Sequence, residues 1–189
     1  VLSSFFFGYL LLQIVGGRLA DRYGGTMVLG IGVLVWSAFT IFTPPAAMLG
    51  MGVLLLARIG MGMGEAVTFP SIYSTYARWV PADERARSVA FANSGIPLGT
   101  VFALVVTPII VEELGWQWAF YLFGAVGVVW YSVWRVAVTK TPQQHPGMTG
   151  EELAVIEAGT TASDSAPAPP WRGLLTSAPV WAIIVAHFC

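Results

Sequence analysis

The sequence predicts an all-α, polytopic membrane protein, and two observations carry that prediction. Of its 189 residues 56% are hydrophobic and only 10% are charged, with a mean hydropathy of +0.73, whereas about a quarter of the residues of a soluble domain are charged. Apolar runs long enough to cross a bilayer as helices recur along the chain, separated by short polar breaks. The one cysteine, Cys189, excludes a disulfide within the chain.

The first apolar run, residues 1–15, is predicted to be the last part of a membrane-spanning helix. It is expected to end in the turn at residues 16–25, GGRLADRYGG, because glycines permit a tight reversal at the membrane surface. Within the run, Tyr9 and Gln13 are four residues apart and place two hydrogen-bonding groups on one helix face. They either line a cavity or act as a packing aromatic and an interhelical tie.

Residues 27–43 are predicted to form a second span that closes at Pro44 and Pro45, since proline cannot continue a helix. Residues 48–78 are predicted to form a third, long span, which Pro70 is expected to kink. Two further spans are predicted at residues 88–111 and 116–138.

The one long polar segment begins near Lys140. Thr149 and Glu152 make a capping box, which predicts a short surface helix at residues 150–158. Residues 162–170 read as a flexible linker and 171–176 as an interfacial piece, and Pro179 is expected to start a sixth span. His145 is expected to be solvated in this loop, and His187 is either a packed, hydrogen-bonded residue or a ligand.

Charge placement predicts the orientation. If the spans alternate in direction, eight of the nine basic residues fall on one side of the membrane, and the ninth, Arg58, lies within it. The eight are Arg18, Arg22, Arg78, Arg85, Arg87, Arg135, Lys140 and Arg172. By the positive-inside rule that side is cytoplasmic, or stromal in an organelle of bacterial descent.

The third span carries two ionisable residues, Arg58 and Glu65, although each costs a few kcal/mol inside a membrane. Seven residues correspond to about two helical turns, so both side chains share one face, about 10 Å apart along the axis. This separation is too long for a tight ion pair. It suits one cavity in which Arg58 binds a small anion and Glu65 a proton or cation; the alternative is a structural pair, bridged by water or neighbouring polar groups, that fixes helix packing.

The sequence offers no support for an enzyme. It contains no Cys–His cluster for a metal and no nucleophile–base pair, and its one glycine-rich run, GMGMGE, lies inside a predicted span with no strand before it. We therefore expect no cofactor, no metal site and no nucleic-acid partner; the expected partners are a small anion and the lipid bilayer.

Residues 17–24, GRLADRYG, resemble the signature loop G-x-L-A-D-R-x-G that follows the second helix of the major facilitator superfamily. The aspartate and arginine of that loop hold the cytoplasmic gate in the family. The resemblance therefore implies that Asp21 and Arg22 are gating residues.

Nearly the whole chain is similar to one branch of that superfamily, the anion:cation symporters, which include vesicular glutamate transporters, sialin, sodium-phosphate cotransporters and plant plastid phosphate transporters. The resemblance rests on SSFFFGYLLLQIVGGRLADRYGG, ARIGMGMGEAVTFPSIYSTYARWVPADERARS, GWQWAFYLFGAVGVVW and PPWRGLLTSAPVWAIIVAHFC. The run VLGIGVLVWSAFTIFTPPAA is most similar to the plastid phosphate members. Leu2 stands where vesicular glutamate transporters have a histidine, which argues against that subgroup.

The resemblance implies a partial major facilitator fold, with helices two to six and the start of helix seven of a twelve-helix transporter. Residues 1–138 would be the N-terminal transmembrane bundle without its first helix. Residues 139–178 would be the cytoplasmic inter-bundle loop, and residues 179–189 the start of the C-terminal bundle. Alternating access would come from rocking one bundle against the other.

Matched residue by residue, Arg58 falls on an arginine tied to anion binding and Tyr9 on a tyrosine that faces the solute, with Gln13 beside it. Glu65 falls on the acidic residue tied to cation or proton coupling. The implied function is symport of inorganic phosphate or a small organic anion with sodium or protons. The transporter would be monomeric, in a plastid envelope or plasma membrane, with a vesicle membrane as a further option. The alternative is a non-transporting membrane sensor or scaffold on the same fold, with the polar loop as its partner site.

Overall fold

The structure, a computed structural model, describes residues 2–164, 173 and 176–188, and in this part of the chain it is helical with no strand. In chain order the elements are α1 (Leu2–Tyr23), α2 (Gly25–Leu49), α3 (Met51–Glu65), α4 (Thr68–Trp79), α5 (Arg85–Leu114), α6 (Trp116–Ala137), the 3-10 helix η1 (Pro142–Gln144), α7 (Gly150–Asp164) and α9 (Ala178–Phe188). Five segments are long and apolar enough to cross a membrane, with α3 and α4 together forming one of them. The prediction of an all-α, multi-pass membrane protein is confirmed.

Helix α1 does not end where the sequence suggested. It continues through residues 16–23 and stops only at Gly24, whose φ of +96° is the left-handed backbone that favours glycine. The expected turn was wrong because Gly16 has a packing role instead: a Cβ at this position would lie 2.8 Å from Val67 Cγ1. The glycine lets α1 cross the junction of α3 and α4 closely.

Helix α2 also runs past its expected end. Pro44 and Pro45 lie inside the helix, which ends at Gly50 with φ of +119°. Pro44 is fully buried, so packing against neighbouring helices holds the backbone helical despite the lost hydrogen bonds. The expectation that the proline pair closes this span was wrong.

The predicted kink in the third span is confirmed, and it divides that span into α3 and α4. The break lies at Ala66 and Val67. Pro70 has no N–H to donate to the carbonyl of Ala66, four residues earlier, which accounts for the position of the break. Glu65 is therefore the last residue of α3 and lies directly at the break.

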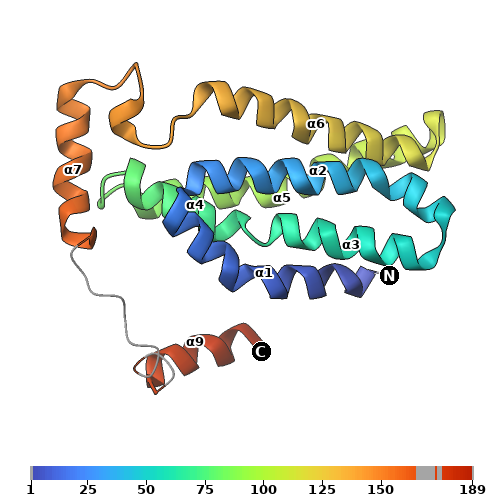
Figure 1. Cartoon of the computed structure of the whole chain (residues 1–189), viewed down its shortest axis with the longest axis horizontal. Coiled ribbons are helices and arrows are strands. Elements are labelled where there is room, and N and C mark those ends of the chain that lie inside the picture. Colours follow the sequence, from blue (N-terminus) through green and yellow to red (C-terminus); the bar gives the residue numbers. More distant parts are fainter. Residues whose placement is uncertain (1, 165–172, 174–175, 189) are drawn as a thin grey trace.

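Helix α3 packs between α1 and α2 (Figure 1). Gly8 of α1 and Gly62 of α3 lie so close to the facing backbones, at Ile59 and Phe5, that neither position has room for a Cβ. On the α2 side, a Cβ at Gly64 would lie 2.7 Å from the backbone nitrogen of Trp36. Glycine therefore sets the helix-to-helix distance on both sides of α3.

The ends of α1, α4 and α6 meet on one side of the bundle. Arg78 Nη2 donates a 3.1 Å hydrogen bond to the backbone oxygen of Asp21, and a Cβ on Gly24 would lie 3.4 Å from Lys140 Cγ. Arg22, Arg78 and Arg135 lie near these ends and Lys140 lies just beyond α6, while Arg85 at the start of α5 donates a hydrogen bond to the carbonyl oxygen of Ala77 near the end of α4. The cytoplasmic orientation of this side stays a prediction.

The polar segment after α6 folds back over this side. The ring of His145 lies 5.9 Å from that of Trp79 in an edge-on arrangement, and His145 is half-buried rather than fully solvated. The capping box is confirmed: the Thr149 N–H and hydroxyl donate to Glu152 Oε2 at 3.0 and 2.9 Å.

Helix α7 is longer than predicted. It continues to Asp164, so the first residues of the expected linker are helical, and residues 165–170 of that linker lie outside the described residues. Most of the expected interfacial piece at 171–176 also lies outside them. Helix α9 begins at Ala178, next to the expected start at Pro179, and lies apart from the bundle (Figure 1).

Replacing Gly62 by alanine should lower the stability of the full-length protein by about 1–3 kcal/mol, because the added Cβ forces α1 away from α3. Gly52→Ala is the matched control, since it makes the same change in the same helix with nothing within 4 Å. Thermal unfolding in detergent measures both. Equal melting temperatures for the two variants would show that close packing at Gly62 does not stabilise the bundle.

The capping box should make α7 sensitive to pH. Hydrogen bonds from the Thr149 backbone N–H and then its hydroxyl hold the pKa of the Glu152 carboxyl below its ordinary value. This stabilisation is present above the ordinary pKa and is lost as pH falls through the lowered one. Hydrogen exchange should show Glu152→Ala deprotecting α7 near neutral pH, with the difference from the unsubstituted protein shrinking in acid. Glu151→Ala is the control, and an equal effect from it would contradict the capping role.

Candidate functional site

The packing of α3 leaves one of its faces with a distinct chemistry. One side of the helix packs against α1 at Gly62, and another side packs against α2 at Gly64. Between these contacts lies the face that carries Arg58, Met61 and Glu65, spaced three and four residues apart. Arg58 and Glu65 are therefore on the face of α3 that its contacts with α1 and α2 leave open.

Arg58 is half-buried, and its guanidinium contacts a sulfur atom and an aromatic ring. Its Nη1 lies 3.8 Å from the sulfur of Met61, and its Cζ lies 5.6 Å from the ring centroid of Phe120 on α6. Its Nε is buried and has no hydrogen-bond partner, and among the described residues no carboxylate accepts from the guanidinium. The aromatic face and the sulfur stabilise the positive charge without neutralising it. The guanidinium therefore keeps donors available for an oxyanion.

Glu65 lies about two turns further along the helix, at the break between α3 and α4. It is half-buried, and Tyr9 of α1 packs against the same part of α3, since a Cβ on Gly62 would lie 3.0 Å from the Tyr9 backbone nitrogen. One turn further, the hydroxyl oxygen of Thr68 is buried without a hydrogen-bond partner. An unsatisfied buried polar group costs about 1–3 kcal/mol, so this polar face has unused capacity for hydrogen bonds.

The remaining sequence-derived candidates do not all join this face. Tyr9 is half-buried beside α3, with its ring 6.0 Å from that of Phe5, whereas Gln13 is exposed one turn along α1. Asp21 and Arg22 lie near the C-terminal end of α1 and are exposed; the Arg22 Cζ lies 5.5 Å from the Tyr23 ring. These last two lie outside the Arg58–Glu65 face, and their gating role stays a prediction.

Sequence reasoning missed Phe120. The residue stands in an aromatic-rich stretch, WQWAFYLFG, in which no spacing distinguishes it from its neighbours. Its contact with Arg58 depends on how α6 packs against the bundle, so only the tertiary structure reveals it.

Comparison with known proteins decides the family. The model of the family described as the Major Facilitator Superfamily matches residues 1–189. The chain belongs to the major facilitator superfamily. Its helical, multi-pass architecture is accordingly part of the major facilitator fold.

Curated relatives agree with the branch that the sequence resembles. The chain is 46% identical over 187 residues to "Probable anion transporter 1, chloroplastic" of Oryza sativa subsp. japonica, covering 99% of this chain and 35% of that protein. It is 44% identical over 187 residues to "Sodium-dependent phosphate transport protein 1, chloroplastic" of Arabidopsis thaliana, with 99% and 36% covered. Over 189 residues it is 40% identical to "Sialin" of Homo sapiens, with 100% and 38% covered.

These relatives confirm the resemblance to anion:cation symporters. The chain spans about a third of the length of the curated relatives it matches.

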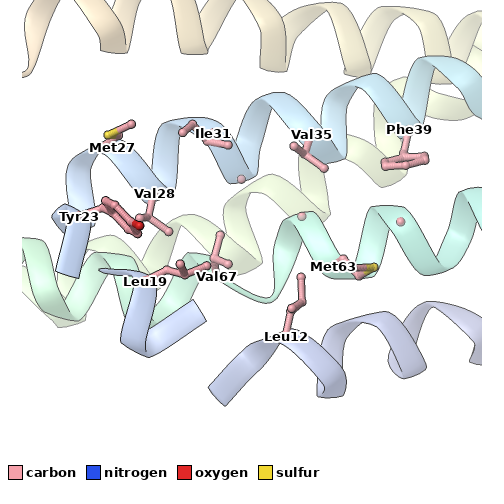
Figure 2. A pocket seen from close by; sticks show the side chains of 13 residues that line it. Leu12, Leu19, Tyr23, Met27, Val28, Ile31, Val35, Phe39, Met63 and Val67 are labelled. Carbon is pink, nitrogen blue, oxygen red and sulfur yellow. The ribbon is translucent and has the colours of Figure 1, made fainter. Parts of the chain in front are cut away.

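A large apolar cavity lies on the side of α3 that faces away from Arg58 and Glu65. It has a volume of about 490 Å³, and its lining, shown in Figure 2, contains no charged residue. Leu12 and Leu19 of α1 and Val28 of α2 contribute to it, together with Met63 of α3. Met63 lies about 140° around the helix from Arg58. This cavity cannot neutralise an anion, so the polar face is the better candidate site.

If the polar face borders water, a cysteine there should react with a charged, membrane-impermeant methanethiosulfonate. We expect Met61→Cys to react at least about tenfold faster than Met63→Cys, because the two positions are two residues, about 200°, apart around the helix. The experiment uses full-length protein whose other cysteines are replaced. Equal rates, or faster labelling of Met63→Cys, would place the aqueous cleft elsewhere.

Proposed function

We propose that the full-length protein is a secondary active transporter of inorganic phosphate or a small organic anion, driven by sodium or protons. The observation that carries this proposal is the half-buried guanidinium of Arg58, which shares a helix face with Glu65 and donates to no carboxylate within the part of the chain that the structure describes. A membrane-embedded cation without an ion-pair partner is costly. Binding an oxyanion lowers that cost and gives the arrangement a function.

The printed names of the relatives support this class of substrate. They include a sodium-dependent phosphate transport protein, an ascorbate transporter and several probable anion transporters, all labelled chloroplastic, as well as sialin. What these names share is a small anion and a transport role. We propose the same class for this protein, a plastid envelope as its membrane, a monomer as its working unit, and no enzymatic activity or resident cofactor.

Coupling follows from the two charges on one face. The anion neutralises Arg58 while sodium or a proton neutralises Glu65. With either site empty, closing the cleft would bury an uncompensated charge, which costs several kcal/mol. Closure is therefore least costly when both sites are filled, and this links the two fluxes. The break next to Glu65 puts backbone groups near the cation site, as in the discontinuous helices of other transporters.

Two substitutions separate binding from coupling. Arg58→Gln should abolish both gradient-driven uptake and anion counterflow, because the anion loses its forked donor. Glu65→Gln, a permanently neutral side chain, should lose gradient-driven uptake but retain counterflow. Phosphate and small organic anions are tested in proteoliposomes that contain the full-length protein.

Arg87→Gln serves as the control, because Arg87 is exposed on the first turn of α5, away from this face. The proposal fails if Arg58→Gln and Glu65→Gln both retain full gradient-driven uptake. It also fails if Arg87→Gln causes the same loss as Arg58→Gln.

A further inference from the structure

A second site lies on a different part of the chain, between α2 and α6 at the cytoplasmic end. Here a crevice of about 300 Å³ is formed by Thr26 and Met27 of α2 and by Tyr131, Trp134 and Arg135 of α6, with Lys140 just beyond α6. None of these residues belongs to the Arg58–Glu65 face. The crevice therefore needs an explanation of its own.

Aromatic side chains give the crevice a fixed wall. Trp134 Nε1 donates a 2.9 Å hydrogen bond to the backbone oxygen of Thr26, which ties α6 to the start of α2. Trp130 stacks on Trp134 with ring centroids 4.9 Å apart and an interplanar angle of 17°. A Cβ on Gly30 would lie 3.2–3.3 Å from the rings of Trp134 and Tyr131, so both rings pack flush against α2.

The electrostatics of the crevice are one-sided. Of the described residues that line it, only Arg135 and Lys140 are charged, and both are basic. The N-terminus of the 25-residue helix α2 adds a third positive source, since its N-cap residue Gly24 supplies no side-chain hydrogen bond to the first turn. Lys140 lies against this same N-terminus, with its Cγ 3.4 Å from where a Gly24 Cβ would be. The ammonium group of Lys140 and the positive N-terminal end of α2 repel each other. An anion bound between them would be attracted to both.

The part of the crevice that faces away from the cytoplasm is apolar and open to the membrane. Met27 is 48% exposed and Ile31, one turn deeper, is 43% exposed, and both line the crevice. Tyr and Trp belong at the depth where headgroups meet acyl chains. A ligand here thus has an anionic group at the basic end and hydrocarbon along α2.

We propose that this crevice binds an anionic phospholipid, with its phosphate between Lys140, Arg135 and the N-terminus of α2 and an acyl chain along Met27 and Ile31. Basic pockets between membrane helices on the cytoplasmic side are suited to such headgroups. The lipid would brace α2 against α6, and this role is independent of which solute the protein transports.

Native mass spectrometry of the full-length protein, titrated with phosphatidylglycerol or with phosphatidylcholine, tests the proposal. Phosphatidylglycerol should bind more tightly, and Lys140→Gln and Arg135→Gln should each weaken its binding about fivefold. Lys140→Arg keeps the charge and should retain binding. Arg87→Gln, which removes one exposed cytoplasmic charge outside the crevice, is the matched control.

Three results would overturn the assignment. Equal binding of the two lipids would remove the need for a headgroup charge. Equal affinities in Lys140→Gln, Arg135→Gln and Arg87→Gln would show that no particular basic residue holds the lipid. Displacement of bound phosphatidylglycerol by millimolar inorganic phosphate would assign the crevice to a soluble anion. Elution of each variant as a single folded species in size-exclusion chromatography confirms that the comparison is between intact proteins.

Discussion

The close approach of α3 to both α1 and α2 is the constraint on which the rest of the structure depends. Burying apolar side chains against one another gains little in lipid, so membrane helices associate mainly through van der Waals contact at short distance. Gly8 and Gly62 provide that contact on one side of α3, and Gly64 provides it on the other. Because these contacts fix the rotation of α3, Arg58 and Glu65 are held on the face that neither neighbour covers.

The two sides of α3 show that a large cavity is not necessarily the functional site. The cavity near Met63 is large but has no charged group, and hydrocarbon suits it. The opposite face carries Arg58 and Glu65, and the unpartnered hydroxyl of Thr68 follows at the start of α4. The soft contacts of Arg58 with Met61 and Phe120 matter because an acidic partner would consume the donors that an oxyanion needs.

Features set by local chemistry could be predicted from the sequence, and features set by packing between helices could not. The capping box at Thr149 and the shared face of Arg58 and Glu65 depend on residues only three or seven apart. Gly16 was misread because a glycine that ends a helix and one that admits a neighbouring helix look alike in sequence. Pro44 was misread for a similar reason, since its burial holds α2 helical. The contact between Arg58 and Phe120 joins helices distant in the sequence, so no pattern indicated it.

The central claim is that the guanidinium of Arg58 and the carboxyl of Glu65 act on one cleft, so that filling one site favours filling the other. The most direct measurement is the dissociation constant of the anion, in the purified full-length protein, as a function of sodium or proton concentration. Coupling of this kind should raise anion affinity about tenfold or more when the cation site is filled, and Glu65→Gln should make the affinity independent of the cation. An unchanged cation dependence in Glu65→Gln would contradict the account.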